Sequence, residues 1–135
     1  MDIYAENILD HFRSPRHAGI LADATVVHEE KNLSCGDELK LSLLLENGKV
    51  MQIGWEGTGC AISQSSMSIL SEELIGKNEE DVLALTKNDV YKLLGVPIGP
   101  RRFKCALMSL HTMKNAILKA RGENVQSWTE TVTEE

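Results

Sequence analysis

The chain has 135 residues, 42% of them hydrophobic and 25% charged, which fits one globular domain and excludes a fibrous or wholly disordered protein. Twenty acidic against 14 basic residues give a formal net charge of -6, so we expect no nucleic-acid partner and no membrane partner. No apolar run approaches the roughly 18 residues of a bilayer-spanning helix, and the N-terminus lacks the basic residues of a signal peptide. We expect a cytoplasmic protein that is a monomer or a weak homo-oligomer.

The N-terminal quarter predicts one helix followed by irregular chain. Residues 2–12 place apolar side chains at helical spacing among acids, and this pattern stops at Ser14 and the proline after it. Irregular chain then leads to a short strand that begins near Val26. A polar, glycine-containing loop over residues 31–36 follows this strand.

The clearest local pattern is an alternation of apolar and polar residues on both sides of the pair Asn47-Gly48. Such an alternation around an Asn-Gly turn is typical of an antiparallel hairpin with one buried face. The residues expected on that face are Leu39, Leu41, Leu43 and Leu45 on the first strand and Met51, Ile53 and Trp55 on the second.

The second half of the chain predicts helices. A serine-rich helix follows Cys60 and ends at Gly76, and its small side chains allow another element to approach closely. Residues 78–94 predict one or two short helices, with Asn78 as an N-cap. After a glycine- and proline-rich break, a long amphipathic helix opens at Cys105 and ends before Gly122.

These elements predict an α+β fold in which a small antiparallel β-sheet of about three strands packs against helices. The predicted boundaries are a single domain over residues 1–122 and a flexible tail over residues 123–135, which lack periodicity and end in two glutamates.

Three cysteines are the most informative feature of the chemistry. Cys35 lies in the loop before the hairpin, Cys60 follows a glycine-rich turn at a helix start, and Cys105 opens the last helix. An odd number of scattered thiols does not form a disulfide framework, whereas thiols on loops and helix starts can converge on one ion. Three unrelated buried cysteines remain the alternative on spacing alone, since no Cys-x-x-Cys pair is present.

The helix starts favour ionised thiols. Unpaired N–H groups and the helix dipole lower the pKa of a thiol, and Arg101, Arg102 and Lys104 add positive charge beside Cys105. Asp37, two residues after Cys35, could supply a fourth ligand oxygen, although an aspartate after glycine is also an ordinary turn residue.

Four blocks of the chain strongly resemble the iron-sulfur cluster assembly scaffold family known as IscU, SufU and the N-terminal domain of NifU. The resemblance runs from Tyr4 to about Ala120. The blocks are Asp10-His11-Phe12 with Pro15-Arg16-His17 and Gly19, then Ser34-Cys35-Gly36-Asp37, then Gly57-Thr58-Gly59-Cys60-Ala61-Ile62-Ser63, and finally Arg102-Phe103-Lys104-Cys105-Ala106.

The resemblance implies a sheet covered by helices on one face and a scaffold function. It implies that the protein accepts sulfur from a cysteine desulfurase, binds iron, assembles a transient [2Fe-2S] cluster and passes it to recipient apo-proteins. By position the implied cofactor and metal ligands are Cys35, Cys60 and Cys105, with Asp37 keeping the cluster labile. A carboxylate among soft thiolates is consistent with weak retention.

Two departures from the family pattern point in opposite directions. Lys104 stands where many IscU-type scaffolds have histidine, and this pattern resembles SufU-type proteins, which hold Zn²⁺ on three cysteines and the aspartate. The short stretch between Cys60 and Cys105, in contrast, resembles IscU-type chains. The alternative to a scaffold that is not an enzyme is therefore a SufU-like zinc-dependent sulfurtransferase that stimulates its desulfurase.

The expected mechanism gives Cys105 the role of persulfide acceptor. Its neighbouring cations and helix start favour a thiolate there, which is the form that accepts sulfur. His11 and His17 are expected to have packing or surface roles, and no motif supports a role for His28 or His111 in metal binding. His111 lies six residues after Cys105, so on a helix it points well away from that thiol.

Overall fold

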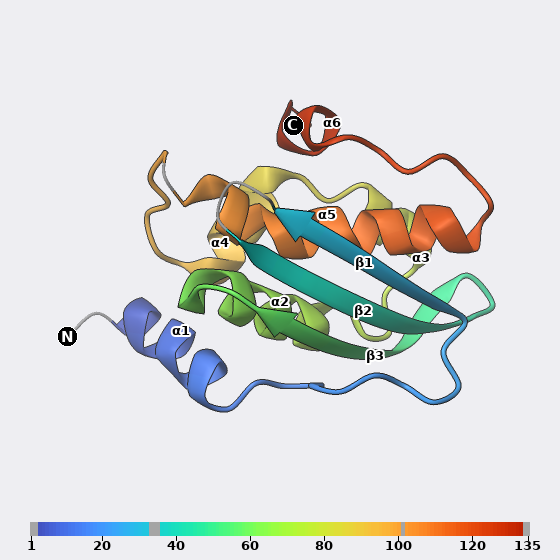
Figure 1. Ribbon diagram of the computed structural model, residues 1–135, viewed down its shortest axis with the longest axis horizontal. Helices are drawn as coiled ribbons and strands as arrows, with labels where there is room; N and C mark the ends of the chain where they lie inside the picture. Colours follow the sequence, from blue (N-terminus) through green and yellow to red (C-terminus); the bar gives the residue numbers. More distant parts are fainter. Residues whose placement is uncertain (1–2, 33–35, 101, 134–135) are drawn as a thin grey trace.

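The computed structural model describes residues 3–32, 36–100 and 102–133, and Figure 1 shows their arrangement. The elements in chain order are α1 (Ile3–Arg13), β1 (Val26–Asn32), β2 (Asp37–Glu46), β3 (Lys49–Thr58), α2 (Ala61–Leu74), α3 (Glu79–Leu83), α4 (Lys87–Leu94), α5 (Phe103–Ala120) and α6 (Trp128–Thr133). The α+β fold predicted from the sequence is confirmed.

The sheet has three antiparallel strands in the order β1-β2-β3. The predicted hairpin is confirmed, with Glu46 and Lys49 paired around the Asn47-Gly48 turn. The prediction that Met51 faces the core is wrong: Met51 is exposed, and Val50 is buried instead. A register shift between Leu44 and Leu45 causes this, because one extra residue moves the following side chains to the opposite face.

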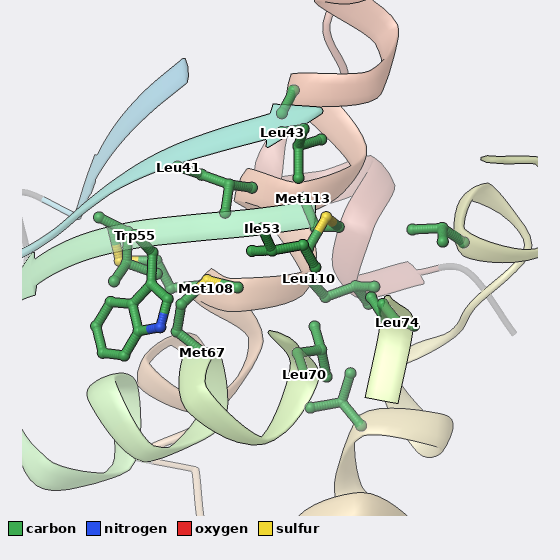
Figure 2. Close-up of a cluster of buried hydrophobic side chains, with 14 of the residues drawn as sticks. Leu41, Leu43, Ile53, Trp55, Met67, Leu70, Leu74, Met108, Leu110 and Met113 are labelled. Atoms are coloured by element: carbon green, nitrogen blue, oxygen red, sulfur yellow. The ribbon is translucent and has the colours of Figure 1, made fainter. Parts of the chain in front are cut away.

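Helices α2 and α5 cover one face of the sheet and enclose the core with it (Figure 1). Alternate side chains of β2 and β3 point toward these helices, as Figure 2 shows for Leu41, Leu43, Ile53 and Trp55. The helices contribute residues such as Met67 of α2, which is fully buried. The apolar face read from the strand alternation therefore forms one wall of the core, and the helices form the other.

The serines of α2 allow two other helices to pack closely against it. The Ser65 hydroxyl donates to the carbonyl of Ile8 in α1 at 2.7 Å, and the Ser66 hydroxyl donates to the carbonyl of Ala106 in α5 at 2.7 Å. A hydroxyl on so short a side chain can reach a neighbouring helix backbone only when the two helices are close. This confirms the close approach predicted from the serine content.

The irregular chain after α1 lies along the sheet. Gly19 and Trp55 share a backbone hydrogen bond of 2.7 Å at the free edge of β3, and the amide of Leu21 donates to the Ser42 hydroxyl at 3.0 Å. Gly54 is required here, because a Cβ at this position would lie 2.3 Å from the carbonyl oxygen of Gly19. This segment therefore runs along the edge of β3 and contacts the face opposite α2 and α5 at Ser42 and Gly54.

The region after α2 contains the two short helices that its sequence predicts, α3 and α4. A capping box opens α4, where the Thr86 amide donates to the Asp89 carboxylate at 2.8 Å. Asn78 is the N-cap of α3, but its side chain makes no capping hydrogen bond and instead contacts Asp81. Among the described residues, no helix has the length and apolar character needed to cross a bilayer.

Residues 123–133, for which the sequence predicts a flexible tail, fold back onto α5 in the structure. The ring of Trp128 stacks on His111, with ring centroids 4.2 Å apart and the planes inclined by 17°. The Gln126 amide donates to the Asn115 side chain at 2.8 Å, and Thr131 is fully buried. These contacts are long-range, so the lack of periodicity in the segment could not reveal them.

Candidate metal centre

Three of the predicted ligands converge at one end of the sheet. A carboxylate oxygen of Asp37 and the sulfur atoms of Cys60 and Cys105 all lie within 4.8 Å of one another. Asp37 and Cys105 are 2% and 5% exposed, and Cys60 is half-buried. The group is therefore open mainly on the side of Cys60.

The three side chains come from three junctions of the fold. Asp37 is the first residue of β2, Cys60 is the N-cap of α2, and Cys105 lies in the first turn of α5. Because α2 and α5 both begin here, two sets of unpaired helix N–H groups face the same region. Such a region favours bound thiolates and other anions.

Gly59 fits tightly against Asp37 and completes this arrangement. Its φ is +135°, and a Cβ at this position would lie 2.0 Å from Oδ1 of Asp37. The next amide, that of Cys60, donates to the same oxygen at 3.1 Å. The glycine therefore lets the chain bend into α2 while Asp37 stays beside Cys60.

The predicted lowering of the Cys105 pKa is wrong for the metal-free protein. Burial raises the pKa of the Cys105 thiol, and the neighbouring Asp37 and Cys60 raise it further. Arg102 is exposed and Lys104 is half-buried, so water screens their charges. Burial and the two neighbouring groups raise the pKa of Cys105 by more than the helix start, on which the prediction relied, lowers it.

The donor set fits a metal ion. Two cysteine sulfurs and a carboxylate oxygen at mutual distances within 4.8 Å are compatible with the span between ligands of one tetrahedral Zn²⁺ or of an iron site. Cys35, the further predicted ligand, lies outside the described residues, as do its neighbours Leu33 and Ser34 and also Arg101.

His11 takes the packing role expected of it, and His111 has a packing role as well. His11 bonds through Nδ1 to the Ser68 hydroxyl at 2.7 Å, and burial, with a smaller effect from the nearby Arg16, lowers its pKa. His111 bonds through Nδ1 to Thr131 at 2.6 Å and stacks on Trp128. Neither histidine belongs to the group formed by Asp37, Cys60 and Cys105.

A second cluster of polar groups, which the sequence did not predict, surrounds Glu30 on β1. His28 Nε2 lies 3.0 Å from one carboxylate oxygen, Asn115 donates to the same oxygen at 3.0 Å, and His111 Nε2 lies 3.6 Å from the other. Burial alone would raise the pKa of Glu30, but these three partners outweigh it and lower the pKa below its ordinary value. This cluster joins β1, α5 and the segment before α6.

A cavity of about 460 Å³ lies between α2, α3 and α4, with Leu74, Val82 and Leu85 in its lining. These residues are at the C-terminal end of α2, whereas Cys60 is at its N-terminal end. The metal centre, and not this cavity, therefore carries the chemistry indicated by the sequence.

Comparisons with known proteins agree with the resemblance seen in the sequence. A family model described as NifU-like N terminal domain matches residues 3–127. The iron-sulfur cluster assembly scaffold protein IscU of Thermotoga maritima is 38% identical over 133 residues, which cover 87% of this chain and 94% of the relative. The zinc-dependent sulfurtransferase SufU of Bacillus subtilis is 32% identical over 139 residues, covering 90% and 94%.

The solved structures give the same result. The crystal structure of a candidate iron-sulfur cluster assembly scaffold protein for the SUF system from Fervidobacterium islandicum AW-1 has a TM-score of 0.75 and 31% identity, and the match covers 85% of this chain and 96% of that one. A NifU-like N-terminal structure from Brucella abortus, at 21% identity, shares the fold. This chain belongs to the NifU-like N-terminal domain family.

Proposed function

We propose that this protein is an iron-sulfur cluster assembly scaffold that receives sulfur from a cysteine desulfurase, binds iron and assembles a transient [2Fe-2S] cluster for transfer to apo-proteins. The observation that carries the proposal is the convergence of Asp37, Cys60 and Cys105 within 4.8 Å at the start of two helices. The name of the Thermotoga maritima relative, an IscU scaffold, supports the same function.

The proposed ligand set is Cys35, Asp37, Cys60 and Cys105. The three thiolates would bind iron or Zn²⁺ strongly, because soft sulfur ligands suit both metals. The Asp37 oxygen is a harder and weaker ligand for a cluster than a thiolate, so the bond at the Asp37 position would break readily and allow the cluster to leave. In this proposal, the same four residues allow both assembly and transfer.

Sulfur delivery is proposed to use Cys105 as the acceptor. Burial and its acidic neighbours raise the pKa of the metal-free Cys105 thiol, so the step would need a metal bound at the centre to favour the thiolate. That thiolate would attack the outer sulfur of a persulfide on the desulfurase, forming a new S–S bond while the desulfurase cysteine leaves as a thiolate. Cys105 is only 5% exposed, so the step requires the desulfurase to uncover it or Cys60 to receive the sulfur first. A protein with these partners would work in the cytoplasm, where thiols stay reduced.

A second candidate function is that of a zinc-dependent sulfurtransferase. The observation that favours it is Lys104, which stands directly before Cys105 where many IscU-type scaffolds have a histidine as a further potential ligand. The Bacillus subtilis relative bears the name zinc-dependent sulfurtransferase SufU. In this case Zn²⁺ would remain in the site and the protein would turn over with its desulfurase.

Metal analysis followed by anaerobic reconstitution tests the proposal. The purified protein would be analysed for iron and zinc, then incubated with Fe²⁺, cysteine and a cysteine desulfurase while the visible spectrum is recorded. A scaffold forms a sulfide-to-iron chromophore that is lost in Cys60→Ser and Cys105→Ser, whereas Lys49→Ala, at the far end of the hairpin, keeps it. Tightly held zinc with no chromophore would favour the sulfurtransferase and overturn the scaffold.

The acceptor assignment has its own measurement. Cys105→Ser is expected to abolish persulfide formation on this protein when a persulfidated desulfurase is added, as read by mass spectrometry of alkylated protein. Persulfide at the wild-type level on that variant would exclude Cys105 and direct the assignment to Cys60 or Cys35.

A further inference from the structure

The Ser63 hydroxyl differs from those of the other buried serines of α2. Ser63 is fully buried, and its oxygen has no hydrogen-bond partner among the described residues. The hydroxyls of Ser65, Ser66, Ser68 and Ser71 are equally buried and each has a partner. A buried hydroxyl without a partner is unfavourable, so this position needs an explanation.

The packing of α2 on α5 places Ser63 beside the metal centre. Both helices begin at this centre and run side by side in the same sense (Figure 1). The Ser66 hydroxyl lies 2.7 Å from that of Ser109. Residues three or four apart share one face of a helix, so one turn back along each helix leads from Ser66 to Ser63 and from Ser109 to Cys105.

The chemistry of this position suits a hydroxyl donor. A thiolate bound to metal carries negative charge and accepts hydrogen bonds, and outer groups that donate to metal ligands tune metal affinity. Serine has one O–H that rotates to meet such an acceptor. Ser63 and Cys105 each lie one turn closer to the helix starts than the Ser66–Ser109 contact, so the Ser63 hydroxyl faces the turn of α5 that carries this thiol.

We propose that Ser63 is a positioning residue that donates a hydrogen bond to the Cys105 thiolate when the centre holds a metal or cluster. This inference rests on the proposed metal-binding function and deepens it. The metal-free protein then keeps an unpaired hydroxyl that metal binding satisfies, so part of the metal affinity comes from Ser63.

The test compares Ser63→Ala with Ser66→Ala, which removes a hydroxyl from the same face of the same helix. Each protein is titrated anaerobically with Co²⁺, a spectroscopic substitute for Zn²⁺, and the thiolate-to-cobalt charge-transfer band is recorded. The metal-free proteins are unfolded in urea in parallel. Ser66 has partners in the metal-free protein, so its removal should destabilise that form and leave Co²⁺ affinity unchanged.

The expected result is that Ser63→Ala binds Co²⁺ about 10-fold more weakly, within the range known for groups that support metal ligands. Its charge-transfer band moves to lower energy, because the thiolate loses a hydrogen bond. Metal-free Ser63→Ala is as stable as the wild type or more so, since an unpaired polar group has been removed.

Two results overturn the inference. Equal Co²⁺ affinity and an unmoved band in Ser63→Ala would show that the serine serves only for close packing, while the metal centre itself stands. A wild-type protein that gives no charge-transfer band at all would overturn the metal centre, and the role of Ser63 with it.

Discussion

Replacing Gly59 with alanine perturbs the metal centre through the backbone and not through a ligand. The φ of +135° is unfavourable for any residue with a Cβ, and here the new methyl group would also lie 2.0 Å from Oδ1 and 2.7 Å from Cγ of Asp37. Asp37 is 2% exposed and cannot turn freely into water. We expect the carboxylate to be displaced and its hydrogen bond from the Cys60 amide to be lost.

The loss of stability in Gly59→Ala is the sum of two contributions, the strained backbone conformation and the lost hydrogen bond. A left-handed conformation imposed on a residue other than glycine costs about 1–3 kcal/mol. The hydrogen bond from the Cys60 amide to a charged carboxylate contributes about 1.5–3 kcal/mol. Together they predict that the free energy of unfolding falls by roughly 2.5–6 kcal/mol. Because Asp37 is one of the proposed ligands, the affinity for Zn²⁺ should also fall by about 10–100-fold.

Gly76→Ala is the matched control for this variant. Gly76 has a φ of +89° with open space around its Cβ position, and it lies beyond the far end of α2. It should lose stability through the backbone term alone and keep wild-type Zn²⁺ affinity. The assays are urea unfolding followed by circular dichroism and competition for Zn²⁺ with a chromophoric chelator. Wild-type Zn²⁺ affinity in a folded Gly59→Ala protein would show that the tight fit of Gly59 against Asp37 does not hold this ligand in the metal centre.

Three further predictions concern the core, the C-terminal segment and pH. Leu41→Ala, at a fully buried position, should lower the free energy of unfolding by about 2–5 kcal/mol in urea titrations, and a smaller loss would mean that the core relaxes to fill the space. Trp128→Ala removes the stacking on His111, which is worth about 1 kcal/mol. This variant should exchange the backbone amides of α6 faster than the wild type, and its Zn²⁺ affinity should stay unchanged. Unaltered amide exchange would contradict the role of Trp128 in holding α6 on α5. Glu30 has a pKa held below its ordinary value of 4.5, so its ionised form stabilises the fold above about pH 4.5, and this contribution is lost as the pH falls further. Wild-type protein should therefore lose more stability than Glu30→Gln between about pH 5 and about pH 3. Equal losses in the two proteins would mean that ionised Glu30 does not stabilise the fold.

Local patterns in the sequence were sufficient for most of the elements. The alternation around Asn47-Gly48 predicted the hairpin, because a strand with one buried face must alternate. The serine content of α2 predicted close helix packing, and Ser65 and Ser66 make the contacts that this requires. Met51 was assigned to the wrong face, because a register shift inside a strand leaves no mark in the alternation before it.

The C-terminal segment shows a different limit of prediction from local sequence patterns. Residues 123–133 have no periodic pattern, yet Trp128 and Thr131 pack against His111 on α5. The Glu30 cluster likewise joins residues from β1 and α5 that are 85 positions apart in the chain. Side-chain partners at such separations depend on how helices are placed on the sheet, and no local signal encodes that placement.

For the metal centre, the residue types could be read from the sequence: thiols and a carboxylate at junctions between elements, in an order that resembles a scaffold family. The folded structure was needed to show that Asp37, Cys60 and Cys105 meet within 4.8 Å and that Cys105 is buried. Burial also reversed the expected direction of its pKa, because desolvation and two neighbouring acidic groups outweigh a helix dipole and exposed cations. Chemistry is encoded in residue identity, whereas distance and solvation arise only when distant segments pack together.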